Sequence, residues 1–192
     1  MGNWYPPRMS RVVVLGIGNV LMGDDALGPH VVKQLQAGYV LPDHVTVVEG
    51  GTPGVDLAAY LKGVETLVVV DTLRLDAPPG TLHVLDKSAL LASRPVQAMN
   101  LHEPGLREAL LTMEFEGGGP REVRLVGVVP SRVDGGIGLS RPVRDALPQV
   151  LARTLSELAA LGVEARKRQP PGEPDLWWER DPALDSSEET AS

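Results

Sequence analysis

Short apolar runs alternate along the chain with longer amphipathic segments. Four of these runs are RVVVLGIG (11–18), HVTVVEGG (44–51), TLVVVDTL (66–73) and REVRLVGVVP (121–130). Short runs of this kind are typical of strands that helices cover on both faces, as in a parallel sheet. TLHVLDK (81–87) instead alternates between apolar and polar residues. This alternation predicts an edge or antiparallel strand.

The segments between these runs have the pattern of helices. The first is expected to open near Asp24 and to run to about Gln36. The others are VDLAAYLKG (55–63), HEPGLREALLTM (102–113) and PVRDALPQVLARTLSELAALG (142–162). Repeated strand–helix units predict an α/β fold, an open sheet with helices on both faces. In such sheets the ligand site lies at the carboxyl ends of the strands.

The two ends of the chain differ in composition from the middle. We expect residues 1–10 to form a flexible leader and residues 11–163 to form the domain. From Glu164 onward the chain is rich in Pro, Gly, Ser and acidic residues, which predicts a disordered tail over residues 164–192. Trp177 and Trp178 are the exception within it. We expect them to dock loosely on the domain, with partner binding as the alternative.

Composition excludes several classes of function. The formal net charge is −7 and basic residues do not cluster, which argues against a nucleic-acid partner. The absence of cysteine excludes disulfides, thiol catalysis and sulfur-rich metal sites. No apolar stretch is long enough to span a membrane, and the first residues do not resemble a secretory signal. We therefore expect a cytoplasmic protein without a membrane partner.

The segment GIGNVLMGDDALG (16–28) follows the first predicted strand. Gly16 and Gly18 suggest a dinucleotide-binding turn, with Glu49 as the acid after the second strand, but Leu21 occupies the place of the third glycine. The segment also contains two adjacent carboxylates at a helix start. Asp24 is expected to cap the helix, which leaves Asp25 available for another role.

Two further residues are candidates for chemistry at the same edge. Asp71 directly follows three valines of a predicted buried strand, where a carboxylate is costly unless it is hydrogen-bonded or binds a cation. His102 lies at the start of a predicted helix, whereas His30, His44 and His83 are expected to be structural. Asp25, Asp71 and His102 would together form a mixed oxygen and nitrogen site, which suits nickel or zinc.

The GGTPG loop (50–54) follows the second predicted strand at this edge. Paired glycines permit backbone conformations that other residues avoid. The loop is either a plain strand–helix turn or a surface shaped to admit a peptide backbone, through Gly50, Gly51 and Thr52.

These segments together resemble the hydrogenase maturation peptidases, which process the large subunit of nickel–iron hydrogenases. The resemblance covers residues 11 to about 162 and rests on segments in a shared order. These are GIGNVLMGDDALG, EGGTPG, LVVVDTL, LHEPGL, LVGVVP and IGLS. It implies a three-layer α/β/α fold of the phosphorylase/hydrolase-like type, with a mostly parallel five-stranded sheet and one antiparallel strand.

The resemblance also implies an activity and a site. The implied enzyme is an aspartate- or metal-dependent endopeptidase that removes the C-terminal extension of the large-subunit precursor after nickel insertion. Asp25, Asp71 and His102 match the implied metal-recognising set. For the hydrolytic step our hypothesis is attack by a water molecule that is activated either by the substrate-bound metal or by Asp25 or Asp71 as general base. Nickel is expected to arrive with the substrate, and the protein to be a monomer. The alternatives are a non-catalytic metal-sensing assembly factor, a nucleotide-binding domain and a peptidase for another precursor.

Overall fold

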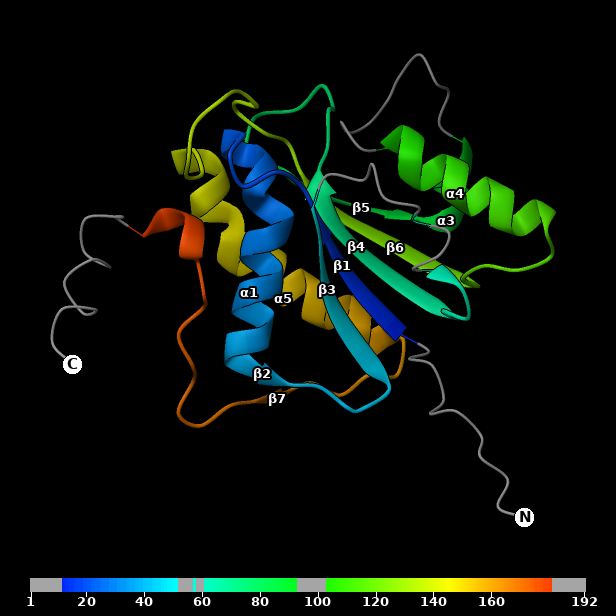
Figure 1. The fold of residues 1–192 in the computed structure, drawn as a ribbon. Helices are drawn as coiled ribbons and strands as arrows, with labels where there is room; N and C mark the ends of the chain where they lie inside the picture. The colour runs from blue at the N-terminus through cyan, green and yellow to red at the C-terminus, as the bar shows by residue number, and fades with distance from the viewer. Residues whose placement is uncertain (1–11, 52–56, 58–60, 93–102, 181–192) are drawn as a thin grey trace, which may run out of the picture.

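A five-stranded sheet forms the centre of the computed structural model, which describes residues 12–51, 57, 61–92 and 103–180 (Figure 1). Its strand order is β3-β1-β4-β6-β5. The strands are β1 (Val12–Ile17), β3 (Val45–Gly51), β4 (Thr66–Thr72), β6 (Glu122–Val128) and β5 (Leu82–Asp86). All neighbours pair in parallel except β5, which lies antiparallel to β6 at one edge. The sheet confirms the predicted topology, including the antiparallel edge strand.

Helices cover both faces of this sheet, as predicted (Figure 1). On one face lie α1 (Leu27–Gly38) and α5 (Arg141–Ala160), and on the other α3 (Lys87–Ala92) and α4 (Glu103–Phe115). Alternate residues of each strand therefore enter different cores. Val68 and Val70 of β4 pack towards α1 and α5, whereas Leu67 and Val69 pack into the opposite core. Among the described residues, no helix is both long and apolar enough to cross a membrane.

One predicted helix is only partly described, and one helix was not predicted. Of the predicted helix over 55–63, the structure describes only a few residues, among them Leu57 and Leu61, which are buried in the second core. Helix α3 was not anticipated. Asp86 caps it, because its Oδ1 accepts hydrogen bonds from the Ala89 N–H at 2.8 Å and the Ser88 hydroxyl at 2.7 Å. These two hydrogen bonds, the one from the Ala89 N–H contributing most, hold the pKa of Asp86 below its usual value.

Residues 164–180 form a C-terminal strap that runs back along α1 (Figure 1). In this strap β7 (Arg166–Lys167) pairs antiparallel with β2 (Tyr39–Val40), and η3 (Trp177–Glu179) is a turn of 3₁₀ helix. The Gly172 N–H also donates to the carbonyl of Ala37 at 2.9 Å. The structure thus differs from the disorder expected of residues 164–180, because α1 supplies backbone and side-chain partners that composition does not reveal. Residues 181–192, like the expected leader, lie outside the described residues.

Trp178 fixes the end of the strap. Its side chain is buried, with 4% exposure, whereas Trp177 is 54% exposed. The Trp178 indole meets the ring of His30 on α1 edge to face, with 5.3 Å between centroids. Glu179 Oε1 lies 3.2 Å from His30 Nε2. One of the two tryptophans is therefore packed firmly, in contrast to the loose docking expected of both.

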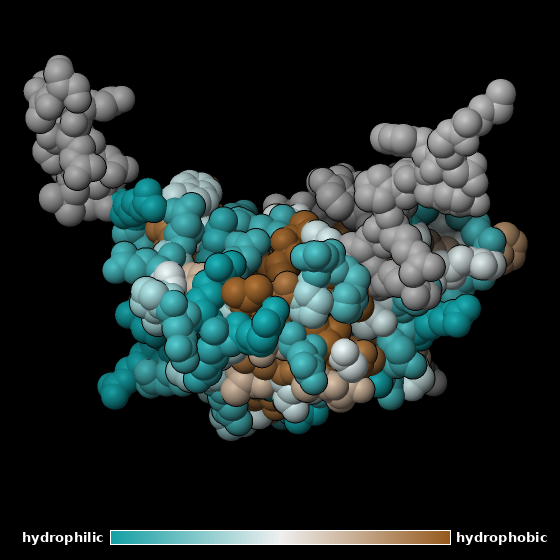
Figure 2. Space-filling model, turned by 90° about the horizontal axis from the view of Figure 1, so that it is seen from below, coloured by the Kyte–Doolittle hydropathy of each residue, from teal (hydrophilic) through white to brown (hydrophobic). Residues whose placement is uncertain are grey.

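The end of the molecule near β2 and β7 is the one seen from below in Figure 2. Hydrophobic side chains gather near the centre of this view and reach its lower rim, and hydrophilic ones lie to either side of them (Figure 2). An open groove of about 650 Å³ lies between Tyr39, the last turns of α5 and residues 162–166. Because α1 and α5 both finish here, the groove lies opposite the strand ends at which a catalytic site is expected.

Replacement of Trp178 should weaken the packing of the strap on α1. We expect Trp178→Ala to lower the free energy of unfolding by about 3 kcal/mol, since it removes a buried aromatic side chain and leaves a cavity. Trp177→Ala is the matched control and should cost less than about 1 kcal/mol. Urea unfolding of the three proteins measures this difference, and equal losses in both variants would contradict the packing described.

Burial of His30 should make the stability of the protein depend on pH. Burial lowers the pKa of His30 below 6.5, and the charge of Arg144 acts in the same direction while Glu179 opposes it. The unfolded chain then binds the proton more tightly than the folded chain. Stability should therefore be fully present above pH 6.5 and fall as the pH decreases towards the folded pKa. Urea unfolding from pH 7 to 5 should show a smaller decline for His30→Gln, and equal declines would contradict this assignment.

Candidate active site

The carboxyl ends of three neighbouring parallel strands meet at one edge of the sheet. β1 ends at Ile17, β3 at Gly51 and β4 at Thr72. This edge is the upper one in Figure 1, where the chain passes from β1 into α1. The structure thereby brings Asp25, Asp71 and the Gly50–Gly51 pair to one edge. Polar residues at such an edge are typical of ligand sites in open α/β sheets.

The glycines of the first motif allow the chain to fold tightly onto itself. A Cβ on Gly16 would lie 2.4 Å from the carbonyl oxygen of Gly28, and one on Gly18 would lie 1.8 Å from that of Asp25. A Cβ on Gly28 would in turn lie 2.2 Å from the Ile17 oxygen and 2.6 Å from the Val70 oxygen. Any side chain at these positions would push α1 away from β1 and β4. The motif therefore sets the position of α1 on the sheet.

This packing excludes the dinucleotide interpretation. The space beside Gly16 and Gly18, which a pyrophosphate would require, is filled by the backbone of the same segment. Glu49, the candidate partner for a ribose, instead forms an ion pair with Lys33 of α1, with 3.2 Å between Oε2 and Nζ. The glycines instead allow α1 and β1 to pack closely against each other.

Asp25 lies in η1 (Gly23–Ala26), the short 3₁₀ helix that leads into α1, and its side chain is 2% exposed. Its Oδ2 accepts a hydrogen bond from the Asn19 N–H at 2.8 Å. The Asn19 Oδ1 in turn accepts the Leu21 N–H at 3.0 Å. These bonds fix the carboxylate relative to the loop that follows β1.

Asp71 is the second-to-last residue of β4 and is fully buried. Its Oδ1 accepts the N–H of Thr72 at 2.7 Å. The start of α1 rests on the carbonyl of Val70, and η1 packs beside β4. Asp25 and Asp71 therefore lie on neighbouring elements at the carboxyl end of the sheet. Buried carboxylates are costly to maintain as a purely structural feature, and carboxylates of this kind serve as general bases or cation ligands.

The remaining predicted site residues are only partly described. Gly51 has a φ of +57°, a conformation that favours glycine, and its carbonyl accepts the Gly18 N–H at 3.1 Å. Gly50 packs against Leu15 of β1. His102 and Thr52 lie outside the described residues, so their roles stay predictions. In the part of the chain that is described, no three His, Asp or Glu side chains are grouped to hold a metal ion.

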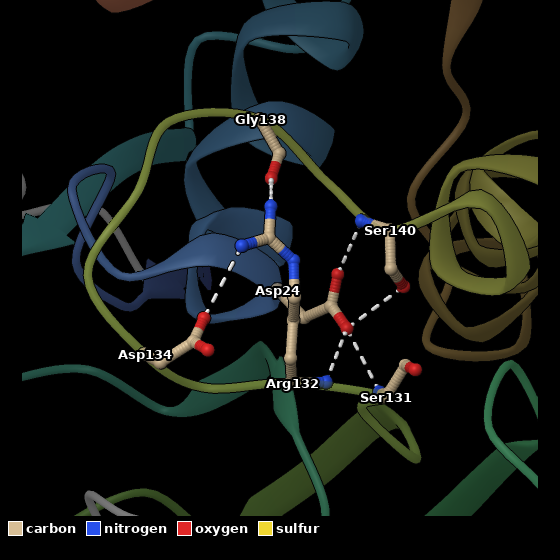
Figure 3. A network of polar contacts seen from close by, with 6 residues as sticks. All are labelled: Asp24, Ser131, Arg132, Asp134, Gly138 and Ser140. Carbon is tan, nitrogen blue, oxygen red and sulfur yellow. Dashed lines mark hydrogen bonds and ion pairs between the residues drawn. The ribbon is translucent and has the colours of Figure 1, made fainter.

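Asp24 has a role that sequence reasoning missed. The expectation that it caps a helix is wrong, because neither η1 nor α1 begins with a side-chain cap. Its buried carboxylate instead accepts four hydrogen bonds from the loop between β6 and α5 (Figure 3). The donors are the N–H groups of Ser131, Arg132 and Ser140, at 2.8, 3.0 and 2.6 Å, and the Ser140 hydroxyl, at 2.8 Å.

This arrangement joins two loops, which we name the first edge loop (18–23) and the second edge loop (131–139). Besides the bonds to Asp24, the Gly23 N–H donates to the carbonyl of Gly136 at 2.8 Å, and the Gly136 N–H donates to that of Leu21 at 2.9 Å. Ser140 was the one part of this contact that the sequence could have indicated. It stands just before a helix that opens with Arg-Pro, a common pattern at the N-terminus of a helix.

Known proteins share this fold and these segments. The family model described as hydrogenase maturation protease matches residues 29–157. The chain is 33% identical over 163 residues to the hydrogenase 2 maturation protease of Escherichia coli (strain K12), covering 83% of this chain and 97% of that protein. It is 36% identical over 160 residues to the hydrogenase expression/formation protein HupM of Azotobacter chroococcum mcd 1, covering 83% and 77%.

Solved structures agree with these matches. The hydrogenase maturating endopeptidase HybD from E. coli superimposes with a TM-score of 0.75 at 33% identity, covering 83% of this chain and 99% of that one. A hydrogenase 2 maturation peptidase from Thaumarchaeota archaeon SCGC_AB-539-E09 gives a TM-score of 0.60 at 34% identity, covering 78% and 98%. The fold and these matches thus define an α/β protease. The chain belongs to the hydrogenase maturation protease family.

Removal of the Asp24 carboxylate should destabilise the edge. Asp24→Ala would leave three backbone N–H groups and a hydroxyl without their acceptor, so we expect a loss of at least about 3 kcal/mol in the free energy of unfolding. Asp134→Ala is the control, because it removes an exposed carboxylate from the same loop and should change stability by less than about 1 kcal/mol. Chemical denaturation measures both, and a similar small effect in each would contradict the assigned role.

Proposed function

We propose that this protein is the endopeptidase that removes the C-terminal extension from the large-subunit precursor of a nickel–iron hydrogenase once nickel has been inserted. Membership of the hydrogenase maturation protease family supports the general activity. The observation that carries the proposal is the pair of buried carboxylates, Asp25 and Asp71, at the strand ends of a protease fold.

The chemistry proposed is hydrolysis by an activated water molecule. The chain contains no cysteine, so a thiol nucleophile is excluded. Asp25 or Asp71 accepts a proton from water while the oxygen attacks the scissile carbonyl carbon. The proton is then passed to the amide nitrogen as the C–N bond breaks, which releases the peptide as an amine. A carboxylate base in a water-poor corner is suited to this role because few solvent molecules compete for it.

Nickel belongs to the substrate in this proposal. It would supply a Lewis acid close to the scissile bond when the loaded precursor binds. Asp25 and Asp71 offer oxygen donors, and His102 would add an imidazole, which leaves thiolate coordination to the precursor. This donor set fits a borderline divalent ion. Gly50, Gly51 and Thr52 are the residues proposed to receive the substrate backbone beside it.

The setting of the reaction forms part of the same proposal. We place the protein in the cytoplasm and treat it as a monomer that meets the precursor transiently. Its formal charge of −7 agrees with a protein partner in preference to a nucleic acid.

Loss of either carboxylate should abolish processing. Asp25→Asn and Asp71→Asn keep the shape of the side chains but remove the base, so we expect each to slow cleavage by about 10²- to 10⁴-fold. Asp145→Asn on α5 is the control, because this carboxylate is exposed and pairs with Arg141 of the same helix, and the variant should cleave at the wild-type rate. Full activity in one of the first two variants removes that residue from the mechanism.

The same assay tests the activity itself. Intact-mass analysis of a cognate precursor, nickel-loaded or nickel-free, should show loss of a C-terminal peptide from the loaded form alone. Cleavage of neither form by the wild-type protein would contradict the endopeptidase and favour the metal-sensing assembly factor. Cleavage of both forms would contradict the dependence on nickel.

A further inference from the structure

The two edge loops carry a pair of exposed apolar side chains beside the candidate active site. Leu21 and Ile137 are each 55% exposed. We propose that this pair, here named the apolar rim, is a docking surface for apolar residues of the substrate polypeptide next to the scissile bond. The proposal rests on the endopeptidase function and identifies where the substrate binds.

The two loops meet at the residues that carry these side chains. Met22 and Gly136 form a parallel bridge, and the Gly136 N–H donates to the Leu21 carbonyl at 2.9 Å. Leu21 and Ile137 each adjoin one residue of this bridged pair. Both exposed side chains therefore belong to the short stretch over which the loops are joined, where one polypeptide segment can contact both.

The rim is held in place independently of any partner. Asp24 fixes both ends of the second edge loop through Ser131, Arg132 and Ser140. Inside the arc of this loop, the Arg132 guanidinium donates to Asp134 at 3.2 Å and to the carbonyl of Gly138 at 3.3 Å (Figure 3). A surface fixed in advance loses little conformational entropy on binding. Exposed apolar side chains on such a fixed loop are suited to recognition.

The charges around the rim favour an apolar occupant. Arg132 and Asp134 are the charged residues of the two edge loops, and they pair with each other, with 3.2 Å between Nη1 and Oδ1. The two loops themselves therefore carry no net charge, and Arg144 and Glu179, which lie beside Gly138, are also of opposite sign. Apolar side chains of the substrate lose less free energy of hydration there than charged ones would, and they gain contact with Leu21 and Ile137.

The rim is also continuous with the candidate active site. Leu21 is linked through Asn19 to the carboxylate of Asp25 by two hydrogen bonds, of 3.0 and 2.8 Å. An endopeptidase must bind its polypeptide on both sides of the bond that it cuts. A substrate chain positioned over Asp25 therefore passes next to the apolar rim. For this reason the rim is assigned to the substrate and not to a second copy of this protein.

Steady-state cleavage of the nickel-loaded precursor tests the apolar rim. We expect Ile137→Ser and Leu21→Ser each to raise KM about five- to thirtyfold, with kcat within about twofold of wild type, because the side chains bind substrate and do not touch the reacting atoms. Ile137→Leu keeps an apolar side chain of similar size and should therefore have the wild-type KM. Phe115→Ser is the matched control, since Phe115 is 94% exposed at the end of α4, and its KM should not change.

The outcomes separate this proposal from the activity on which it rests. Cleavage by the wild-type protein together with an unchanged KM in Ile137→Ser overturns the docking surface and leaves the endopeptidase standing. Absence of cleavage by the wild-type protein overturns both. Circular dichroism checks that each variant is folded. If Leu21→Ser does not fold, the KM values of the Ile137 variants alone test the docking surface. A fall in kcat with unchanged KM in Ile137→Ser would also contradict a binding role.

Discussion

The buried carboxylate of Asp24 is the interaction on which the functional edge of this protein depends. A fully desolvated charge is costly, and here four donors from one loop satisfy it. The loop begins just after β6 and ends at Ser140, the residue before α5, so one carboxylate near the start of the chain fixes the connection between two late elements. Asp25 is the next residue. The position of a candidate catalytic group is therefore set by the same segment that closes the edge.

Close backbone packing provides the second constraint. The absence of side chains at Gly16, Gly18 and Gly28 lets α1 approach β1 and β4 within contact of their carbonyl groups. This approach brings η1, which carries Asp25, beside β4, which carries Asp71. The motif resembles a phosphate-binding turn in its glycine spacing, yet its glycines serve contact within the protein. The distinction lies in what occupies the space beside each glycine, which sequence spacing alone does not reveal.

Sequence reasoning predicted the features that follow from local pattern. Buried strands such as β4 are continuous apolar runs, and β5 alternates because one edge of the sheet is antiparallel and partly exposed. It also predicted that Asp25 and Asp71 lie at the carboxyl end of the sheet, because parallel strands share the direction of their ends. Helix α3 was missed, although Asp86 with Ser88 and Ala89 behind it is a recognisable capping pattern.

Features that depend on distant partners could not be predicted in this way. The donors to Asp24 are mostly backbone N–H groups more than 100 residues away, and such groups have no sequence signature. The strap is similar, because β2 and β7 are two residues each and form only through pairing with one another. Its composition indicates disorder in isolation, whereas α1 provides a surface against which Trp178 is buried.

The strap has a consequence for the way the protein is made. Arg168 donates a hydrogen bond to the carbonyl of Gln36, 132 residues earlier in the chain. During synthesis on the ribosome, α1 emerges long before the residues that cover it. The side of α1 that carries His30 remains open to water or to other cellular proteins throughout that interval. It is covered only after α5 has been translated, so docking of the strap follows the synthesis of every strand and helix on which it rests.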